Sequence, residues 1–317
     1  MTPEFALIAR YFTRPAGKAV LGVGDDCALL APSPGMELAV STDTLVAGTH
    51  FFADADARKL GHKALAVNLS DLAAMGATPR YVMLALTLPA IDAAWLENFS
   101  TGFFDLAGEH GVELVGGDTT RGPLSMTLTV FGEVEAGKSL RRDRARAGDD
   151  IWVSGSFGGA ALALNHLQGQ LMLKPDVLER ALVRLHTPQP RVALGRALVG
   201  IAHAAIDVSD GLVADLTHIC ERSQLGATLE WSSVPLSPTL LSVGPERRVE
   251  CALAGGDDYE LCFTAPAAQR SALESLRADV PLTRIGHLHA GEAQVTVKDE
   301  RGGTKSLAAT GFDHFSR

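Results

Sequence analysis

Residues 150–167 read DIWVSGSFGGAALALNHL and contain the clearest strand-to-helix transition of the chain. The apolar run at 150–154 includes Ile151, Trp152 and Val153, which predicts a buried strand. The glycines within 155–159 predict a turn, and the alanines and leucines of 160–167 predict a helix. A strand that leads directly into a helix is the repeating unit of α/β proteins. The stretch therefore predicts that an α/β domain begins here.

The same alternation continues on both sides of this stretch. Downstream, Pro188 and Pro190 end one helix, residues 191–202 form the next, and 204–206 begin another strand. Upstream, apolar runs and helical periodicity alternate between residues 19 and 134 and predict another α/β domain. Its expected strands lie near 19–23, 37–43, 81–88, 112–117 and 125–134, and its expected helices span 56–76 and 92–110.

The boundary between these two parts is expected in residues 138–150, which are polar and basic with almost no apolar periodicity. We therefore expect domains at residues 1–140 and 141–317. The predicted fold class is α/β (α+β) with two domains.

Composition and charge limit the possible functions. The chain has 317 residues, of which 46% are hydrophobic and 21% charged, as in ordinary soluble proteins. Its formal charge of −9 argues against nonspecific nucleic-acid binding, although metal ions can mediate contacts with anionic nucleotides. The scattered Cys27, Cys220, Cys251 and Cys262 indicate neither a zinc site nor a disulfide framework. With no apolar run of about 18 residues and no signal-peptide pattern, we expect a cytoplasmic protein without a membrane partner.

Short runs that place aspartate beside glycine or a small hydroxyl residue recur along the chain. Turns and helix caps also use these residues, so any single run has an ordinary structural explanation. Together they suit magnesium and phosphate, because Mg²⁺ takes carboxylate oxygens and glycine lets a backbone approach phosphate closely. Several follow strand-like stretches, and sites of α/β proteins assemble at strand ends. The runs are Gly24-Asp25-Asp26, Ser41-Thr42-Asp43, Asn68-Leu69-Ser70-Asp71, Gly116-Gly117-Asp118-Thr119-Thr120, Asp207-Val208-Ser209-Asp210-Gly211 and Gly255-Gly256-Asp257-Asp258.

Two glycine-containing segments compete for a phosphate-binding role. Residues 132–139 match the P-loop pattern letter for letter, yet no apolar helix face follows Lys138, so we interpret the match as accidental. Residues 155–159 miss the dinucleotide-binding spacing and are interpreted mainly as a turn, with anion binding as a weaker alternative.

Two further polar residues stand out by position. Asp71 follows Asn68 by three residues on a predicted helix, so the two side chains should share a face. His50 lies near a strand end. A single histidine in such a position is more often a hydrogen-bonded loop residue than a substrate contact. The chain has no G-x-S-x-G elbow and no H-E-x-x-H spacing, which argues against serine acyl transfer and zinc hydrolysis.

In combination, these motifs closely resemble the thiamine-monophosphate kinase family of the aminoimidazole-ribonucleotide synthetase superfamily. The resemblance runs from Phe5 to the C-terminal Gly311-Phe312 and covers essentially the full chain. It is carried by residues 22–28, 41–50, 63–77, 116–120, 206–212 and 258–261.

The resemblance implies both a fold and a reaction. The N-terminal domain would bind magnesium and ATP, and its mixed sheet and helices would form a homodimer interface. The C-terminal α/β domain would complete the ATP and substrate site, with ATP between the domains. The reaction would transfer the γ-phosphoryl group of ATP to thiamine monophosphate, with several Mg²⁺ ions taking part. Nucleic acid is not an expected partner.

The resemblance also implies roles for individual residues. Asp257 stands where the family commonly has Glu, and Phe312 stands where Trp or Tyr is common, so the substrate end departs from the usual pattern. The implied metal ligands are Asp26, Ser41, Thr42, Asp43, Asp71, Asp118, Asp207 and Asp210. The implied ATP contacts are Gly117, Asp118, Arg142 and Ser209, the substrate contacts are His50, Asp257 and Phe312, and the catalytic residues are Asp71, Asp118 and Asp210.

Two alternatives remain open from the sequence. One is another ATP-dependent enzyme of the same superfamily, such as a selenophosphate or formylglycinamidine synthetase, although the glycine-rich Cys-bearing N-terminal segment of the former is absent. The other is a catalytically silent nucleotide-binding regulator. A regulator would not need His50, Asp71 or the Gly311-Phe312 tail, so their presence favours an enzyme.

Overall fold

The structure is a computed structural model that describes residues 3–15, 17–276, 280–299 and 303–306. The chain divides by packing into two compact units. Unit 1 comprises Met1–Leu72 and Ala77–Gly137, and unit 2 comprises Ala73–Gly76 and Lys138–Arg317. Each unit is built on its own mixed sheet, which confirms the predicted α/β fold class.

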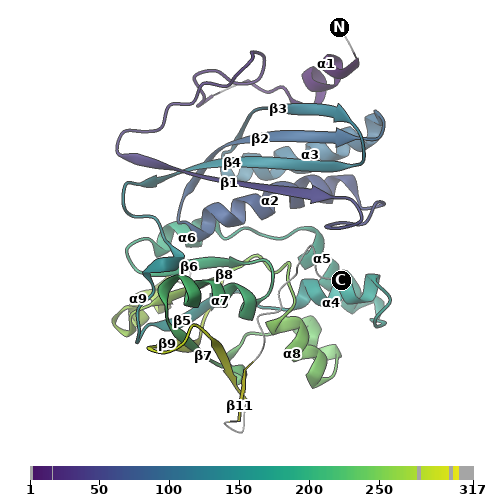
Figure 1. Ribbon diagram of the computed structural model, residues 1–317. Coiled ribbons are helices and arrows are strands. Elements are labelled where there is room, and N and C mark those ends of the chain that lie inside the picture. The colour runs from purple at the N-terminus through teal and green to yellow at the C-terminus, as the bar shows by residue number, and fades with distance from the viewer. Residues whose placement is uncertain (1–2, 16, 277–279, 300–302, 307–317) are drawn as a thin grey trace. The chain divides into compact units, whose positions relative to one another are not determined.

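Unit 1 contains a four-stranded sheet with the order β1-β4-β2-β3 (Figure 1). Strand β4 pairs antiparallel with both neighbours, whereas β2 and β3 are parallel. The edge strands are therefore β1 and β3. The strands are β1 (Met36–Val46), β2 (Thr78–Leu88), β3 (Glu113–Arg121) and β4 (Ser125–Glu135).

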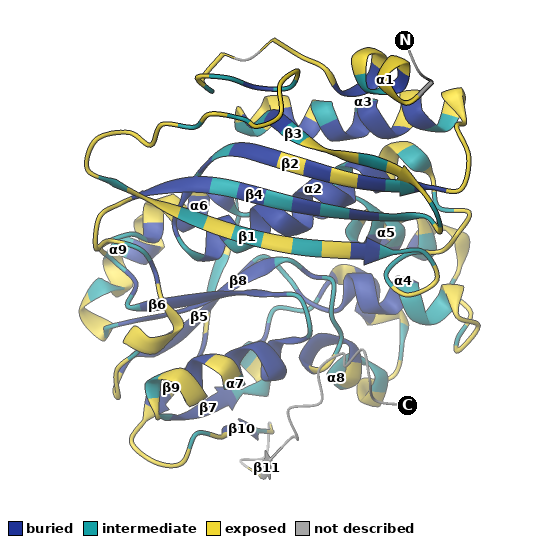
Figure 2. Ribbon diagram, turned by 45° about the horizontal axis from the view of Figure 1, so that its top comes forward, coloured by how far each residue is buried: buried dark blue, intermediate teal, exposed yellow. Residues whose placement is uncertain are grey.

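Two long helices, α2 (Ala57–Ala74) and α3 (Ala93–His110), lie on one face of this sheet (Figure 1). Exposed positions on the other face alternate with intermediate ones along β1 and with buried ones in the middle of β2 (Figure 2). Helix α3 begins where the Asp92 carboxylate accepts hydrogen bonds from the first-turn backbone and ends at Gly111 in the left-handed conformation. The short helices α1 (Pro3–Leu7) and η1 (Ile8–Phe12) precede this sheet.

One expected strand of unit 1 is wrong. Residues 19–23 form bends and isolated bridges, such as Leu21 with Leu29. Val20 is 67% exposed, so this apolar run is not buried against a sheet. The backbone N–H groups of Lys18 and Ala19 donate to the Glu113 carboxylate, at 3.0 and 3.1 Å. A side chain therefore satisfies donors that a neighbouring strand would otherwise pair.

Unit 2 contains a seven-stranded sheet with the order β11-β10-β7-β9-β5-β8-β6. Only the β10 and β7 pair is parallel among the described strands of this sheet. The strands are β5 (Asp150–Ser154), β6 (Ala204–Val208), β7 (Gly226–Glu230), β8 (Glu260–Ala265), β9 (Leu282–His289), β10 (Val295–Lys298) and β11 (Thr304–Ser306).

The first three helices of unit 2 follow the predicted order, with one difference in length. The predicted helix over 191–202 ends at Leu198, because Val199 is extended and Gly200 has a φ of 80°. The helices are α4 (Gly159–Leu167), α5 (Pro175–His186), α6 (Val192–Leu198), α7 (Leu212–Ser223), α8 (Pro245–Leu253) and α9 (Arg270–Ser275). Short 3-10 turns are η2 (Arg142–Arg144), η3 (Trp231–Ser233), η4 (Pro238–Ser242) and η5 (Ala267–Gln269).

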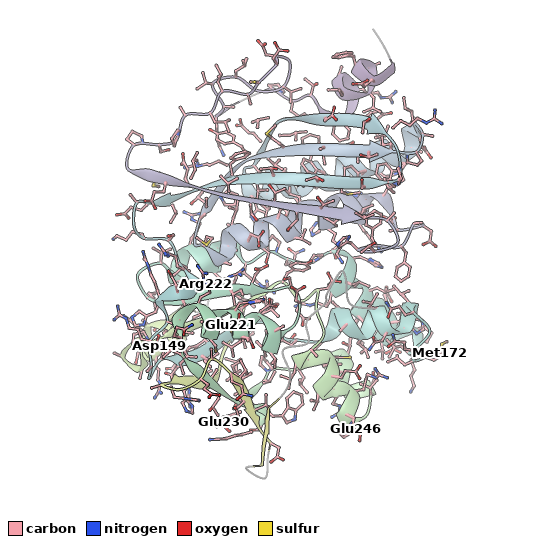
Figure 3. All side chains as sticks on the ribbon, viewed as in Figure 1. Asp149, Met172, Glu221, Arg222, Glu230 and Glu246 are labelled. Carbon is pink, nitrogen blue, oxygen red and sulfur yellow. The ribbon has the colours of Figure 1, made fainter. Side chains whose placement is uncertain are left out.

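A hydrogen bond between Asp149 and His203 fixes the start of β5. The Asp149 carboxylate, labelled in Figure 3, lies 2.9 Å from Nδ1 of His203 and accepts the backbone N–H of Arg146 at 2.9 Å. Asp149 is almost fully buried, so these partners replace the water that its charge would otherwise require. The contact holds the segment before β5 close to the segment before β6.

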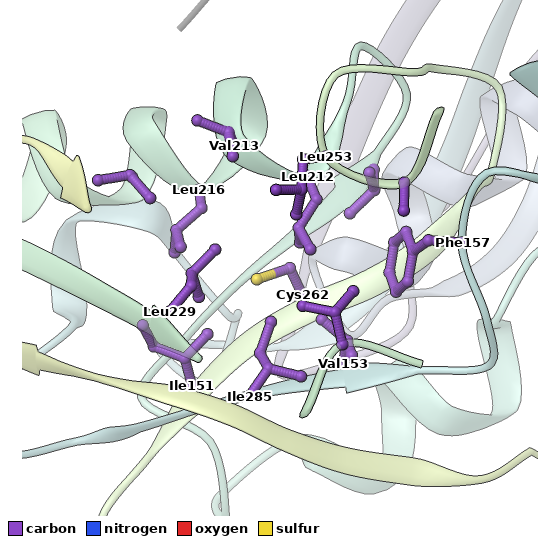
Figure 4. Close-up of a cluster of buried hydrophobic side chains, with 14 of the residues drawn as sticks. Ile151, Val153, Phe157, Leu212, Val213, Leu216, Leu229, Leu253, Cys262 and Ile285 are labelled. Carbon is purple, nitrogen blue, oxygen red and sulfur yellow. The ribbon is translucent and has the colours of Figure 1, made fainter. Parts of the chain in front are cut away.

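The core of unit 2 lies between its sheet and α7. Ile151 and Val153 project from β5 toward Leu212 and Leu216 of α7, with Phe157 at the edge of the cluster (Figure 4). These side chains are fully buried, and each contributes about 1.5–3 kcal/mol relative to an exposed side chain. Apolar side chains of the strand and turn in residues 150–167 thus lie in the core of unit 2. No helix of the described residues is long and apolar enough to span a bilayer.

Candidate active site

In unit 1, a group of oxygen atoms gathers where β1 meets α2. The Ser41 hydroxyl donates to Oδ2 of Asp71 at 2.5 Å. The backbone N–H of Asp43 donates to Oδ1 of Asn68 at 3.2 Å, and the Asn68 amide in turn donates to the carbonyl of Ala64 at 3.0 Å. Because Asn68 is fully buried, these bonds fix it against β1. The predicted shared face of Asn68 and Asp71 is confirmed, since both contact the same strand.

The apolar stripe of α2 explains why Asp71 is held in place. Leu65, Leu69 and Leu72 are almost completely buried, whereas Asp71 is half-buried at the border of that stripe. A carboxylate so placed loses rotational freedom without being sealed from solvent. It can therefore present an oxygen to a cation at little ordering cost.

The predicted ligands of unit 1 divide between the two faces of the sheet. Ser41 and Asp43 alternate with Thr42, whose hydroxyl lies 2.9 Å from that of Thr129 on the open face. Asp118 stands in register with Ala85 and hence on the open face as well. Since β4 and β2 separate β1 from β3, Asp43 and Asp118 stand about 14 Å apart across three strand spacings. Within this unit, their side chains cannot share one ion.

The expectation that the aspartate runs lie at strand ends is wrong for two of them. Asp43 lies inside β1 and Asp118 inside β3, whereas the run from Asp207 to Gly211 spans the end of β6. Pairing continues through these residues, because neighbouring strands still supply backbone partners there. Asp26 lies instead in a bend, where its N–H donates to Oδ1 of Asp25 at 2.9 Å.

His50 is held by the turn that follows β1. Its Nδ1 accepts the backbone N–H of Val46 at 3.0 Å, and Gly48 in this turn has a φ of 82°. The neutral ring must then carry its proton on Nε2. That atom is a donor, which suits an anionic partner.

In unit 2, the run Ser209-Asp210-Gly211 forms a loop between β6 and α7. Three consecutive N–H groups of this loop donate to one oxygen, Oδ2 of Asp215, at 3.0–3.1 Å. Burial raises the pKa of Asp215 to about 6, and the nearby charge of Asp210 adds to the effect. Sequence reasoning missed Asp215; the available signal was a lone acidic residue among the apolar residues of a helix start.

The turn at residues 155–159 also binds a carboxyl group of the protein itself. The N–H of Gly158 lies 3.0 Å from each carboxyl oxygen of Asp258. Complete burial raises the pKa of Asp258 well above its ordinary value. The main interpretation of this stretch as a strand-to-helix turn is confirmed, and this N–H is not available to an external anion.

Glu260 forms a buried ionic cluster beside this turn. It has no exposed side-chain surface, and its carboxylate accepts hydrogen bonds from Arg191, Arg184 and Ser154 at 2.5–2.7 Å. Burial acts to raise the pKa of Glu260, but the hydrogen bonds and charges of Arg191 and Arg184 outweigh burial and lower it. A Cβ at Gly155 would collide with this carboxylate, so the turn requires glycine there.

Arg142 lies in η2 and is positioned through its backbone. The Ser223 hydroxyl donates to the carbonyl of Arg142 at 2.7 Å and accepts the N–H of Ala145 at 3.2 Å. No α-helix forms between Lys138 and β5. The interpretation of the P-loop match as accidental is therefore confirmed, because a P-loop must lead into a helix.

Among the residues that the structure describes, no group of three or more His, Cys, Asp or Glu side chains is arranged as a metal site. The magnesium assignment thus remains a prediction. Phe312 lies outside the described residues. All four cysteines are free thiols, and burial raises the pKa of Cys220 to about 12 and that of Cys251 to about 11.

Comparison with known proteins finds a family match in each part of the chain. The N-terminal domain of the AIR synthase related proteins matches residues 24–134. The C-terminal domain of the same proteins matches residues 146–298.

Three individual proteins show the extent of the similarity. The thiamine-monophosphate kinase of Escherichia coli is 48% identical over 321 residues, which cover 99% of this chain and 98% of that protein. The crystal structure of the thiamine-monophosphate kinase from Stenotrophomonas maltophilia is 49% identical, with a TM-score of 0.84 over 93% of this chain and 95% of that chain. The structure of AaThiL complexed with AMPPCP and TMP is 29% identical, with a TM-score of 0.79 over 90% of this chain and 89% of that chain.

Proposed function

The chain belongs to the thiamine-monophosphate kinases of the AIR synthase related family, and we propose that it transfers the γ-phosphoryl group of ATP to thiamine monophosphate. The products are thiamine diphosphate and ADP. The observation that carries this proposal is similarity over the full length, with 99% of this chain and 98% of the Escherichia coli enzyme covered. AaThiL, solved with AMPPCP and TMP, supports ATP as the co-substrate. The family resemblance that the motifs indicated is confirmed.

The acceptor needs no dedicated base. A phosphate monoester has a second pKa of about 6, so near neutral pH it is largely a dianion and already nucleophilic. The obstacle is repulsion between this dianion and the triphosphate of ATP. We therefore assign to the protein the tasks of aligning both phosphates and of placing positive charge between them, with direct in-line transfer and no phospho-enzyme.

Magnesium fits the oxygen donors of unit 1. Ser41 and Asp71 place a hydroxyl and a carboxylate side by side, and Mg²⁺ binds through one or two carboxylates with water and substrate phosphates completing its shell. The bound ions would neutralise and bridge phosphate oxygens. The residues that would hold them are Asp26, Ser41, Thr42, Asp43, Asp71, Asp118, Asp207 and Asp210, of which Asp71, Asp118 and Asp210 are the catalytic ones.

The ATP contacts are proposed to be Gly117, Asp118, Arg142 and Ser209. Gly117 has a φ of 149°, and a Cβ there would collide with the backbone of Leu84, so only glycine fits β3 at this point. Arg142 is exposed, and its guanidinium can pair with phosphate oxygens in a bidentate manner.

The contacts to thiamine monophosphate are proposed to be His50, Asp257 and Phe312. His50 would donate from Nε2 to the substrate phosphate. Asp257 adopts a φ of 66°, a conformation that a non-glycine residue holds only where its surroundings enforce it. Phe312 would stack on an aromatic ring of the substrate, which needs only a π face.

We propose a cytoplasmic homodimer formed through the open face of the unit 1 sheet. Leu38 and Val40 on β1 are 43% and 55% exposed, and Met83 on β2 is 37% exposed. Apolar side chains on an otherwise open sheet face favour burial against a second copy. Size-exclusion chromatography with light scattering tests this, and Val40→Lys should shift the chain toward monomer.

The decisive test of the function is incubation with ATP, Mg²⁺ and thiamine monophosphate, followed by chromatography for thiamine diphosphate. Stoichiometric formation of ADP and thiamine diphosphate is expected. Omitting the acceptor measures idle ATP hydrolysis. ADP formation that does not depend on thiamine monophosphate would contradict the proposal.

A further inference from the structure

We propose that Asp215 is a positioning residue that orients Ser209 and Asp210 toward the nucleotide, an inference that rests on the function proposed above. Oδ2 of Asp215 accepts the N–H groups of Ser209, Asp210 and Gly211 at 3.1, 3.0 and 3.1 Å. One oxygen thus holds three consecutive peptide groups. Because Asp215 is only 3% exposed and sits on the rigid first turns of α7, it cannot follow a displaced loop.

The opposite side of this loop is fixed as well. The carbonyl of Ser209 accepts the N–H of Asp257 at 2.8 Å, and the carbonyl of Val208 accepts the N–H of Tyr259 at 2.8 Å. Asp257 and Tyr259 both have positive φ, at 66° and 50°. The loop is therefore held between the carboxyl group of Asp215 and a strained segment that carries a proposed substrate contact.

Helix capping alone does not explain this arrangement. The N-cap residue of α7 is Gly211, which has no side chain to cap the helix. Asp215 lies inside the helix and reaches back to residues 209–211, beyond the helix start. It thereby occupies the N–H groups that could otherwise have received a phosphate. Phosphate and metal contacts at this loop are left to the side chains of Ser209 and Asp210, whose direction the three fixed peptide groups determine.

If Asp215 acts as a hydrogen-bond acceptor, its variants should bind ADP in a specific order of affinity. Asp215→Asn keeps a carbonyl oxygen of the same reach and can still accept N–H groups. Asp215→Ala removes the acceptor, and Asp215→Glu keeps the charge but displaces it by one methylene. Thr217→Ala is the matched control, because the Thr217 hydroxyl donates within α7, to the carbonyl of Val213 at 2.7 Å.

The experiment titrates ADP with Mg²⁺ into the full chain by calorimetry and measures the KM values for ATP and thiamine monophosphate. Asp215→Ala should weaken ADP binding and raise the ATP KM about tenfold, the size expected for losing oriented hydrogen bonds. Asp215→Asn should stay within about threefold of the wild type, and Thr217→Ala should match it. The KM for thiamine monophosphate should change less than that for ATP.

Several outcomes would overturn the proposal. One is that Asp215→Ala binds ADP as tightly as the wild type. Another is that Asp215→Ala and Thr217→Ala lose ADP affinity to the same extent. If Asp215→Ala does not fold, Asp215→Asn and Asp215→Glu decide the question. Positioning requires the Glu variant to bind ADP more weakly than the Asn variant, and the reverse order would indicate a role of charge alone. If the wild type makes no thiamine diphosphate while the ADP-binding order holds, the proposed function fails and the positioning role stands.

Discussion

The carboxyl groups compared in the two units differ in their burial and in their hydrogen-bond partners. In unit 1, Asp71 is half-buried, and its carboxylate accepts a hydrogen bond from the hydroxyl of Ser41. In unit 2, Asp258 and Asp215 are buried and bind the protein's own backbone N–H groups. The first arrangement leaves hard oxygen atoms at a border with solvent, whereas the second closes turns that could have held an anion. A buried aspartate whose carboxyl group accepts backbone N–H groups therefore closes a turn of the protein itself.

This difference also explains how the chain can handle phosphate without a P-loop. The N–H of Gly158 and those of residues 209–211 are occupied by internal carboxyl groups. In the proposed function, contacts to phosphate would then depend on cations held by carboxylates and on the guanidinium of Arg142. The following predictions test this division, from the largest expected effect to the smallest.

The strongest test removes anionic oxygens from unit 1. Asp71→Asn and Asp43→Asn should each lower kcat by about a hundredfold or more, because a neutral amide is a poor ligand for Mg²⁺ facing phosphates. Thermal unfolding should stay close to wild type, since an amide can still bond to Ser41. Asp105→Asn, which alters an exposed pair with Arg58, is the control and should retain activity. Near-wild-type kcat in both site variants would refute the ligand assignment.

The second test concerns stability in unit 2. Arg191→Ala should destabilise the protein by about 3 kcal/mol, because it leaves the buried carboxylate of Glu260 with one fewer cation. Urea denaturation measures the change. Arg180→Ala, which breaks an exposed pair with Asp176, should cost less than about 0.5 kcal/mol.

The pH dependence of the stability lost in Arg191→Ala tests whether this loss is ionic in origin. The folded-state pKa of Glu260 lies below its ordinary value of 4.5, so the stabilisation is fully present above that value and is lost as pH falls through the folded pKa. The difference between wild type and Arg191→Ala should accordingly shrink below about pH 4.5. A difference that grows on acidification would contradict the ionic origin.

Arg142→Ala tests the proposed contact between the Arg142 guanidinium and ATP. The ATP KM should rise about tenfold, or kcat should fall by a similar factor, with little change in the KM for thiamine monophosphate. Steady-state kinetics with each substrate varied in turn distinguish these effects. Arg146→Ala serves as the control and should be mild. An effect confined to the acceptor KM would place Arg142 at the other substrate.

Asp258→Asn should contrast with the same substitution at Asp71. Burial raises the pKa of Asp258 well above its ordinary value of 3.8, so the folded protein favours the neutral carboxyl group, which resembles an amide. Below pH 3.8, where the carboxyl group is neutral in the folded and the unfolded protein, the variant should differ in stability by less than about 1 kcal/mol. A raised folded-state pKa means that stability is lost as pH rises above the ordinary value of 3.8, so the Asn variant should gain relative to wild type with rising pH. A relative loss on raising the pH would show that the charged form is needed.

Lys138→Ala should have the smallest effect. No α-helix follows Lys138 before β5 to form a phosphate cradle, so both kcat and the ATP KM should stay within about twofold of wild type. A hundredfold loss would revive the P-loop interpretation and break the proposed division between the two units.

Local sequence predicted most of the elements because their signals are local. The strand at 150–154 has the observed bounds of β5, and the helix expected over 92–110 is observed as α3, one residue shorter, since Asp92 is the cap. The strand expected at 19–23 failed because strand formation needs a partner, and the nearby backbone donors instead bind Glu113. Helical periodicity also placed Asn68 and Asp71 on one face correctly.

The sequence by itself determined the fold class and the family, because these depend on patterns of adjacent residues and on spacing. Only the tertiary structure decided which carboxyl groups are committed. Asp257 and Asp258 are neighbours in one run, yet Asp258 is sealed against Gly158 from 100 residues away. Burial and backbone hydrogen bonds arise from contacts between distant segments, and they determine whether an aspartate binds the protein itself or remains placed to bind a ligand.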